Sequence, residues 1–241
     1  MNLFAEAIAW IADPARWGGG RFSVPNALLD HLFYTVISVL IAAAIAIPLG
    51  YLIGHTGKGR EVAVAISGAA RALPSFGLIV LLVLLLGVTR TAIGAIIAFV
   101  LLAIPSILAG AYAGIEAVDR RTVDAARAVG MTEWQILLKV EAPLGLPLLI
   151  GGLRSAMLQV IATVALAGFV NLGGFGYYVI QGLQLRNYDQ ILAGALLIIA
   201  LVLVIDAIFG VLAKLSEPRG LAAPKKPRAR ATGPRAVGNP T

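Results

Sequence analysis

Few side chains in this chain are suited to chemistry. Its 241 residues include no cysteine and only two histidines, His31 and His55. The lack of cysteine excludes disulfide frameworks, thiol catalysis and cysteine-ligated metal sites. With two histidines in all, a histidine metal site is not favoured either. We therefore expect no catalytic residue, no cofactor and no metal ion.

Three ionisable residues lie within apolar stretches: Arg71, Arg154 and Asp206. Charged side chains are costly in lipid, so residues of this kind are candidates for a functional role. Each can instead lie near the end of a membrane segment, where a long side chain reaches the headgroups. Asp206 can also pair with Arg154, although the sequence does not place the two together.

The glycine-rich stretch at 171–176, NLGGFG, has some likeness to a phosphate-binding loop. It lacks the Lys-Ser/Thr pair that follows the glycines in such loops, so we do not expect it to bind a nucleotide. The glycines instead favour a tight turn after a membrane span.

The composition is that of a membrane protein. Hydrophobic residues make up 59% of the chain and charged residues 13%, and the mean hydropathy is +0.91. Soluble domains carry about 45–50% apolar and about 25% charged residues. We therefore predict an all-α fold, a polytopic bundle of about five membrane-spanning helices. The predicted spans are 32–54, 62–89, 91–115, 147–170 and 191–213.

The second predicted span is interrupted by Pro74, Ser75 and Phe76. Irregular backbone at membrane depth is tolerated where it lines a cavity or is buried in protein. Ser75 and Phe76 are therefore predicted to line a path through the bundle. Gln159, Thr163 and Asn171 are the next candidates for this path. A kink that serves only packing is the alternative.

Lysine and arginine are distributed unequally between the two sides of the membrane. Thirteen fall in the 55–61 loop, the 116–141 segment and the tail, whereas four fall on the opposite side. Cytoplasmic loops carry an excess of these residues. The N-terminus is therefore predicted to lie outside the cell and the C-terminus in the cytoplasm.

Three regions follow from this topology. Residues 1–28 form an external N-terminal segment whose first twelve residues are predicted to be an amphipathic helix anchored by Trp10 and Trp17. Residues 29–215 form the transmembrane domain. Residues 216–241 form a basic tail that is expected to be disordered and to attract anionic lipid rather than nucleic acid.

The longest cytoplasmic connection, residues 116–147, has a pattern of its own, and we call it the elbow. Residues 122–129 are predicted to be a helix, and Gly130 falls where a left-handed C-terminal cap is expected. Thr132 and Gln135 form a capping box for a second helix, which Pro143 is expected to end. Small residues on the first helix suit insertion into a groove on another protein. An interfacial amphipathic hairpin without a partner is the alternative.

The elbow resembles a known family. Asp124-Ala125-Ala126, then Gly130, then Val140-Glu141-Ala142-Pro143 has the spacing of the EAA loop of ABC importer permeases. In that family this loop forms coupling helices that dock onto the ATPase subunits. Two positions depart from the usual pattern, Asp124 in place of Glu and Ala142 in place of Leu. The resemblance implies an ATPase-coupling role for six residues: Asp124, Ala125, Ala126, Gly130, Val140 and Pro143.

The likeness extends beyond the elbow. Residues 70–87, the elbow and residues 171–176 look like the osmoprotectant branch, whose systems import glycine betaine, carnitine, choline or proline betaine. The resemblance implies a permease of the type I ABC importer fold that has no enzymatic activity of its own. Its implied partners are two ATPase subunits, a second permease subunit, identical or paralogous, and an extracytoplasmic substrate-binding protein.

Other functions remain open at this point. Within ABC importers, the nearest alternative cargo is an amino acid such as methionine. A secondary transporter driven by an ion gradient is a candidate of another class, although internal repeats and acidic relays typical of that class are not evident. A membrane scaffold that recruits partners through its tail would have no need of the interrupted second span.

Overall fold

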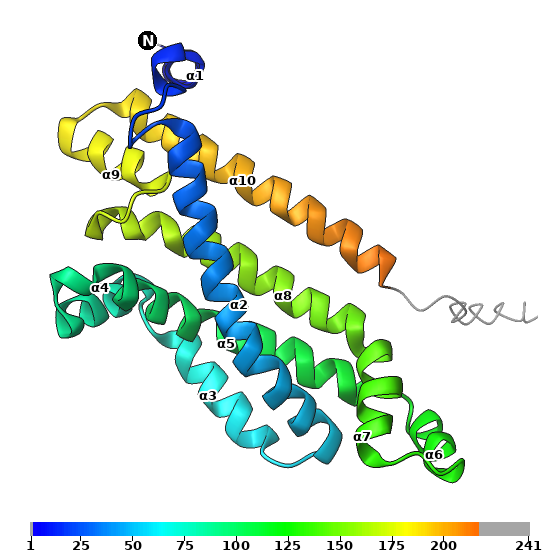
Figure 1. The fold of residues 1–241 in the computed structure, drawn as a ribbon. Helices are drawn as coiled ribbons and strands as arrows, with labels where there is room; N and C mark the ends of the chain where they lie inside the picture. Colours follow the sequence, from blue (N-terminus) through cyan, green and yellow to red (C-terminus); the bar gives the residue numbers. More distant parts are fainter. Residues whose placement is uncertain (1, 217–241) are drawn as a thin grey trace, which may run out of the picture.

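The structure is a computed structural model that describes residues 2–216, apart from the side chains of residues 70 and 71. The predicted tail beyond residue 216 and the role of Arg71 lie outside this description. Within it, the fold is all-helical, as predicted (Figure 1). The α-helices are α1 (Leu3–Ala12), α2 (Val24–Thr56), α3 (Arg60–Ala72), α4 (Ser75–Leu86), α5 (Thr91–Glu116), α6 (Arg120–Ala128), α7 (Glu133–Ile136), α8 (Ala142–Val164), α9 (Gly176–Leu185) and α10 (Tyr188–Leu215). Short 3₁₀ helices cover Pro14–Arg16, Val88–Arg90 and Ala165–Val170, and a π turn covers Leu137–Glu141.

Four helical stretches among the described residues are long and apolar enough to cross a membrane: Val24–Thr56, Val88–Glu116, Glu133–Val170 and Tyr188–Leu215. They contain the first, third, fourth and fifth predicted spans. The second predicted span is not one helix. It is divided into α3 and α4, which separate at Pro74, and neither is long enough to cross alone. The predicted interruption is therefore confirmed, because Pro74 has the extended backbone that precedes a helix.

The helix α5 forms the centre of the bundle. In the most apolar stretch of this helix, 61% of the residues are buried, whereas in the most apolar stretch of α10 none is buried. Glycines four residues apart let neighbouring helices approach it closely. A Cβ at Gly50 of α2 would lie 2.5 Å from the Cβ of Ala111, and one at Gly114 of α5 would lie 2.5 Å from the carbonyl oxygen of Gly145 on α8. The core therefore depends on backbone contact between α2, α5 and α8.

The two ends of the bundle carry different elements. The helices α1 and α9 gather at one end, and the elbow helices α6 and α7 lie at the other (Figure 1). The predicted anchoring of α1 by Trp10 is wrong, because this side chain is buried with its ring centroid 5.0 Å from that of Tyr178 on α9. Tertiary packing thus holds α1, while Trp17 remains exposed.

Candidate functional site: the elbow and the path

The first helix of the elbow ends as predicted. Gly130 has a φ of +87°, the left-handed conformation that residues with a Cβ rarely adopt. Its N–H donates to the carbonyl of Arg127 at 3.0 Å, and the N–H of Met131 donates to the carbonyl of Ala126 at 3.2 Å. These two bonds are those of a Schellman motif. Gly130 therefore reverses the chain between α6 and α7.

The second helix begins as predicted but does not end at Pro143. The N–H of Gln135 donates to the hydroxyl of Thr132, and the N–H of Thr132 donates to the side-chain oxygen of Gln135, which completes the capping box. After α7 the chain forms the π turn and continues directly into α8. Pro143 lies in the first turn of α8, where a missing N–H costs little because the π turn has shifted the bonding pattern. The elbow thus continues without a break into a membrane-spanning helix.

The elbow has an interior of its own. Val118, Val123, Ala126 and Ile136 are buried together. Three further side chains pack against this cluster: Met131, Val140 and Leu144. Ala126 and Val140, both predicted to couple to the ATPase, therefore support the internal packing of the elbow.

The outer surface of the elbow is partly apolar. Val129 is 78% exposed and Trp134 is 65% exposed. Asp124 and Ala125, two further residues of the predicted coupling set, are also exposed, on α6. A closed interior with exposed apolar side chains outside is the arrangement expected of a docking surface.

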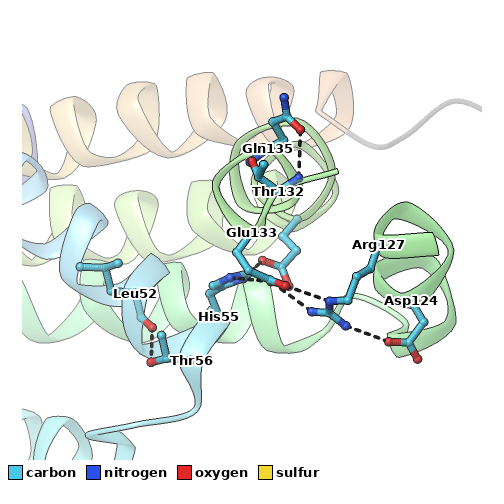
Figure 2. A network of polar contacts seen from close by, with 9 residues as sticks. Leu52, His55, Thr56, Asp124, Arg127, Thr132, Glu133 and Gln135 are labelled. Carbon is cyan, nitrogen blue, oxygen red and sulfur yellow. Dashed lines mark hydrogen bonds and ion pairs between the residues drawn. The ribbon is translucent and has the colours of Figure 1, made fainter. Parts of the chain in front are cut away.

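A chain of polar contacts connects the elbow to the end of α2 (Figure 2). Arg127 donates to both carboxylate oxygens of Glu133 at 2.8 and 3.0 Å and to Asp124 at 3.1 Å. The hydrogen bonds to Glu133 raise the pKa of Arg127. On its other side, Glu133 lies 3.3 Å from Nε2 of His55, whose Nδ1 lies 2.5 Å from Glu141. Sequence analysis singled out Asp124 as a coupling residue but did not predict these contacts, for which the density of charge in the elbow was the available signal.

The predicted path residues fall into two groups. Phe76 begins α4 beside Ser75 and contacts Phe169 with ring centroids 4.8 Å apart. Asn171 and Phe169 both line a cavity of about 520 Å³ against α4 and the segment that follows it. Phe169 was not predicted, because its neighbours in sequence are uniformly apolar.

Gln159 and Thr163 lie deeper in α8. The Thr163 hydroxyl donates to the carbonyl of Gln159 at 2.8 Å and is buried, so its bond is satisfied within the helix. The Gln159 side chain accepts a hydrogen bond from Ser106 of α5 at 3.4 Å. The structure therefore does not bring these two residues to the cavity that Asn171 lines.

The glycine-rich turn packs against the start of α2. Asn171, Gly173 and Gly174 all have positive φ angles. The N–H of Phe175 donates to Nδ1 of His31 at 3.3 Å, and Nε2 of His31 lies 3.0 Å from the carbonyl of Ile161. The ring therefore carries its proton on Nε2, because a carbonyl only accepts and an N–H only donates. This turn is a structural joint between α2, α8 and α9.

A bundle of membrane-spanning helices with a capped helical elbow at one end defines a class, the type I ABC importer permeases. The structure superposes on a chain of the MetNI methionine ABC transporter in an inward-facing conformation with a TM-score of 0.72 at 23% identity, covering 86% of this chain and 99% of that one. This likeness establishes the fold.

The sequence matches the family described as binding-protein-dependent transport system inner membrane component over residues 46–220. It is 30% identical over 192 residues to the glycine betaine/carnitine/choline transport system permease protein OpuCB of Bacillus subtilis, covering 80% of this chain and 88% of that protein. It is 32% identical over 198 residues to the osmoprotectant import permease protein OsmW of Salmonella typhimurium, covering 80% and 91%. The chain belongs to this family of inner membrane transport components.

Proposed function

We propose that this chain is the permease subunit of an ATP-driven importer that carries a small osmoprotectant, glycine betaine or a related quaternary ammonium compound, into the cell. The observation that supports the importer most directly is the elbow, which combines the family's spacing with a closed core and an exposed apolar surface. The cargo is supported by relatives whose names refer to glycine betaine, carnitine, choline and osmoprotectants.

The elbow docks onto an ATPase subunit in this proposal. Asp124, Ala125 and Gly130 present α6 to the partner, and Val129 and Trp134 add apolar contact area around it. Closure of an ATPase dimer upon binding ATP would move the elbow as a unit. Because the π turn joins the elbow to α8 without a break, this movement would reach the membrane.

The proposed complex contains two permease subunits, two ATPase subunits and an external binding protein. The excess of basic residues in the elbow and the 55–61 loop supports a cytoplasmic location for that end of the bundle. The opposite end, with α1, α9 and the glycine-rich turn, would then receive substrate from the binding protein. Ser75, Phe76 and Asn171 are the proposed path residues nearest this end, and Gln159 and Thr163 lie further along α8.

The experiment is uptake of radiolabelled glycine betaine at high external osmolarity, in cells that lack other betaine systems. Cells with the gene are expected to take up glycine betaine only when ATP is available, and cells without it or with Gly130→Pro are not. If uptake continues without ATP but stops when the proton gradient is removed, the protein is an ion-coupled transporter and the importer proposal is wrong. If the cells take up methionine in an ATP-dependent manner but take up no betaine, carnitine or choline, the proposed cargo is wrong and the cargo is an amino acid.

A further inference from the structure

A smaller cavity lies at the end of the bundle that carries α9. Its volume is about 270 Å³, and it is bordered by α9 and by the 3₁₀ segment that follows α8. Tyr177, Gln181 and Gln184 follow one another at spacings of four and three residues, which places them on one side of α9. Phe169 and Asn171 border the cavity from the preceding segment. The polar side of α9 therefore forms part of the cavity wall.

A chain of hydrogen bonds orients the polar groups of this wall. The buried Gln190 of α10 donates from Nε2 to the carbonyl of Tyr178 at 3.2 Å and to Oε1 of Gln181 at 2.8 Å. Gln181 in turn donates from its own Nε2 to the hydroxyl of Tyr177 at 2.7 Å. A hydroxyl that accepts a hydrogen bond still has its own proton to donate. The hydrogen bonds among the described residues do not use this proton, so Tyr177 offers a donor to a ligand.

Two aromatic rings at the cavity are held in place by other rings. Tyr177 stacks on Phe22 with ring centroids 4.1 Å apart and ring planes 7° apart. Phe169 contacts Phe76 of α4, and its side chain is 50% exposed. An exposed aromatic ring attracts a cation, and the attraction is stronger when the cation is desolvated. Phe169 therefore offers a contact for a positive group beside the donor of Tyr177.

The cavity is neutral. Among the described residues that line it, none is charged. A ligand with a net charge would enter without a counter-charge, which is unfavourable in a partly buried site. A zwitterion carries both charges itself, and an N-methylated ammonium group needs no hydrogen-bond acceptor. The wall thus matches a small solute with a carboxylate at one end and a methylated ammonium group at the other.

We propose that this cavity is a binding subsite for a small N-methylated zwitterion such as glycine betaine. The carboxylate accepts hydrogen bonds from the hydroxyl of Tyr177 and from the side-chain amides of Gln184 and Asn171, and the ammonium group lies against Phe169. The choice of ligand rests on the proposed function, and the subsite adds to that function the residues that recognise each end of the cargo.

The subsite adjoins the proposed path. Phe169 and Asn171 also line the larger cavity of about 520 Å³ that extends along α4. Phe169 touches Phe76, which is one of the predicted path residues. A solute in the subsite therefore lies next to the interrupted span, at the end of the bundle that faces the binding protein in this proposal.

The first test measures binding to the full-length protein in lipid nanodiscs by saturation-transfer difference NMR. The two probes are glycine betaine and tetramethylammonium, which has the methylated cation but no carboxylate. Tyr177→Phe keeps the stacked ring and should weaken the binding of glycine betaine about tenfold, as expected for one hydrogen bond to a charged group, without changing that of tetramethylammonium. Phe169→Leu should weaken both probes about threefold or more.

The controls are Tyr188→Phe and Phe33→Leu, which change exposed aromatic residues outside the cavity and should alter neither probe. Unchanged binding in both Tyr177→Phe and Phe169→Leu, or no binding of glycine betaine to the unmodified protein, would overturn the subsite. An equal loss for both probes in Tyr177→Phe would overturn the pairing of this hydroxyl with a carboxylate. If Tyr177→Phe does not accumulate in the membrane, the exposed Gln184→Leu should weaken glycine betaine alone.

The second test is ATP-driven uptake of glycine betaine in proteoliposomes that contain the whole importer, with saturating binding protein. The uptake rate should fall several-fold in Tyr177→Phe and Phe169→Leu and remain normal in both controls. Normal uptake in all four variants would overturn the role of the subsite in transport and leave the proposed function standing. The predicted binding pattern with no ATP-driven uptake of glycine betaine would instead reject the proposed function and leave the subsite intact. Loss of binding-protein docking in Tyr177→Phe and Phe169→Leu, with unchanged binding of both probes, would assign the cavity to a protein contact.

Discussion

Arg154 of α8 and Asp206 of α10 form a bidentate ion pair, with Nε–Oδ1 and Nη2–Oδ2 distances of 2.7 Å each. These are two of the three ionisable residues that lie in apolar stretches of the sequence. Each of the two side chains is partly exposed on the surface of the single chain. The pair fixes α10, the least buried of the four spanning helices, to the rest of the bundle.

Removing one member of this pair should harm the protein more than removing both. Asp206→Asn or Arg154→Leu leaves a charged or polar partner unpaired at membrane depth, which is unfavourable. We expect several-fold less monodisperse protein after detergent extraction, measured by size-exclusion chromatography. The double variant Arg154→Leu/Asp206→Leu should recover most of the loss, because an apolar pair is tolerated there. Lys214→Gln, at the exposed end of α10, serves as the control; equal yields for all variants would contradict the structural role.

The close packing of α5 against α8 at the centre of the bundle leads to a second prediction. Gly114→Leu would force side-chain atoms into the backbone of Gly145 and should destabilise the fold by about 1–3 kcal/mol or more. The matched control is Gly210→Leu on α10, where a Cβ meets nothing within 4 Å. Thermal unfolding in detergent should show a lower Tm only for the first variant. A similar Tm for both would show that α5 and α8 can separate without cost.

The specific role of the turn at Gly130 can be distinguished from a general effect of backbone strain by comparing two glycine substitutions. Gly130 and Gly59 have φ angles of +87° and +81°, and neither has an atom within 4 Å of an added Cβ. Substitution by alanine at either position should cost about 1–2 kcal/mol for the left-handed conformation. Only Gly130→Ala, within the elbow, should also reduce the uptake per ATP hydrolysed, while both proteins remain in the membrane. An equal loss of coupling in Gly59→Ala would remove the special role of the elbow.

A bulky substitution of Ala126 should abolish uptake for a different reason from the one that its motif suggests. The motif predicts contact with the ATPase, but the structure buries Ala126 inside the elbow with Val123 and Ile136. Ala126→Leu should therefore abolish uptake by disrupting the elbow's own packing. The exposed Ala125→Leu should instead act on docking, seen as loss of ATPase co-purification from a protein of unchanged Tm. A stable elbow in Ala126→Leu would contradict this assignment.

Local features of the elbow and the helices could be predicted from the sequence because their causes lie within a few residues. The left-handed Gly130 and the capping box of Thr132 and Gln135 depend on neighbouring backbone groups alone. The end predicted at Pro143 failed because a π turn shifts the hydrogen-bond pattern just before it. No feature of a single sequence marks such a turn.

Contacts between distant segments could not be predicted in the same way. His55 and Glu141 are 86 residues apart, and Arg154 and Asp206 are 52 apart. Their pairing depends on how helices pack and rotate, which hydropathy does not determine. Arg154 and Asp206 were singled out because charge within an apolar stretch is rare, and the pairing that the sequence left as a possibility is confirmed. His55 was overlooked because polar residues at a helix end are common.

Tyr178 gives the fold a dependence on alkaline pH. Its hydroxyl donates to the carbonyl of Phe22 at 2.9 Å, and burial raises its pKa to about 12. Unfolded tyrosine ionises near pH 10, so the stability due to the protonated phenol is fully present below about pH 10 and lost as the pH rises through about 12. The Tm should fall less steeply over this range in Tyr178→Phe than in the unmodified sequence. The exposed Tyr188→Phe is the control and should retain the steep fall, whereas equal slopes for all three proteins would exclude this contribution.

The joint at the glycine-rich turn should be among the most sensitive points of the fold. His31→Leu removes the partners of two backbone groups, the Phe175 N–H and the Ile161 carbonyl, each costing about 1–3 kcal/mol when buried and unpaired. Gly176→Ala should be severe as well, because an added Cβ would collide with the carbonyl of Ala165. The control is Gly151→Ala on α8, where an added Cβ would have no atom within 4 Å. This substitution should be neutral or slightly stabilising. Thermal unfolding in detergent should rank Gly151→Ala near the unmodified protein and the other two far below it. A Tm for His31→Leu close to that of the unmodified protein would mean that this turn does not join α2 to α8.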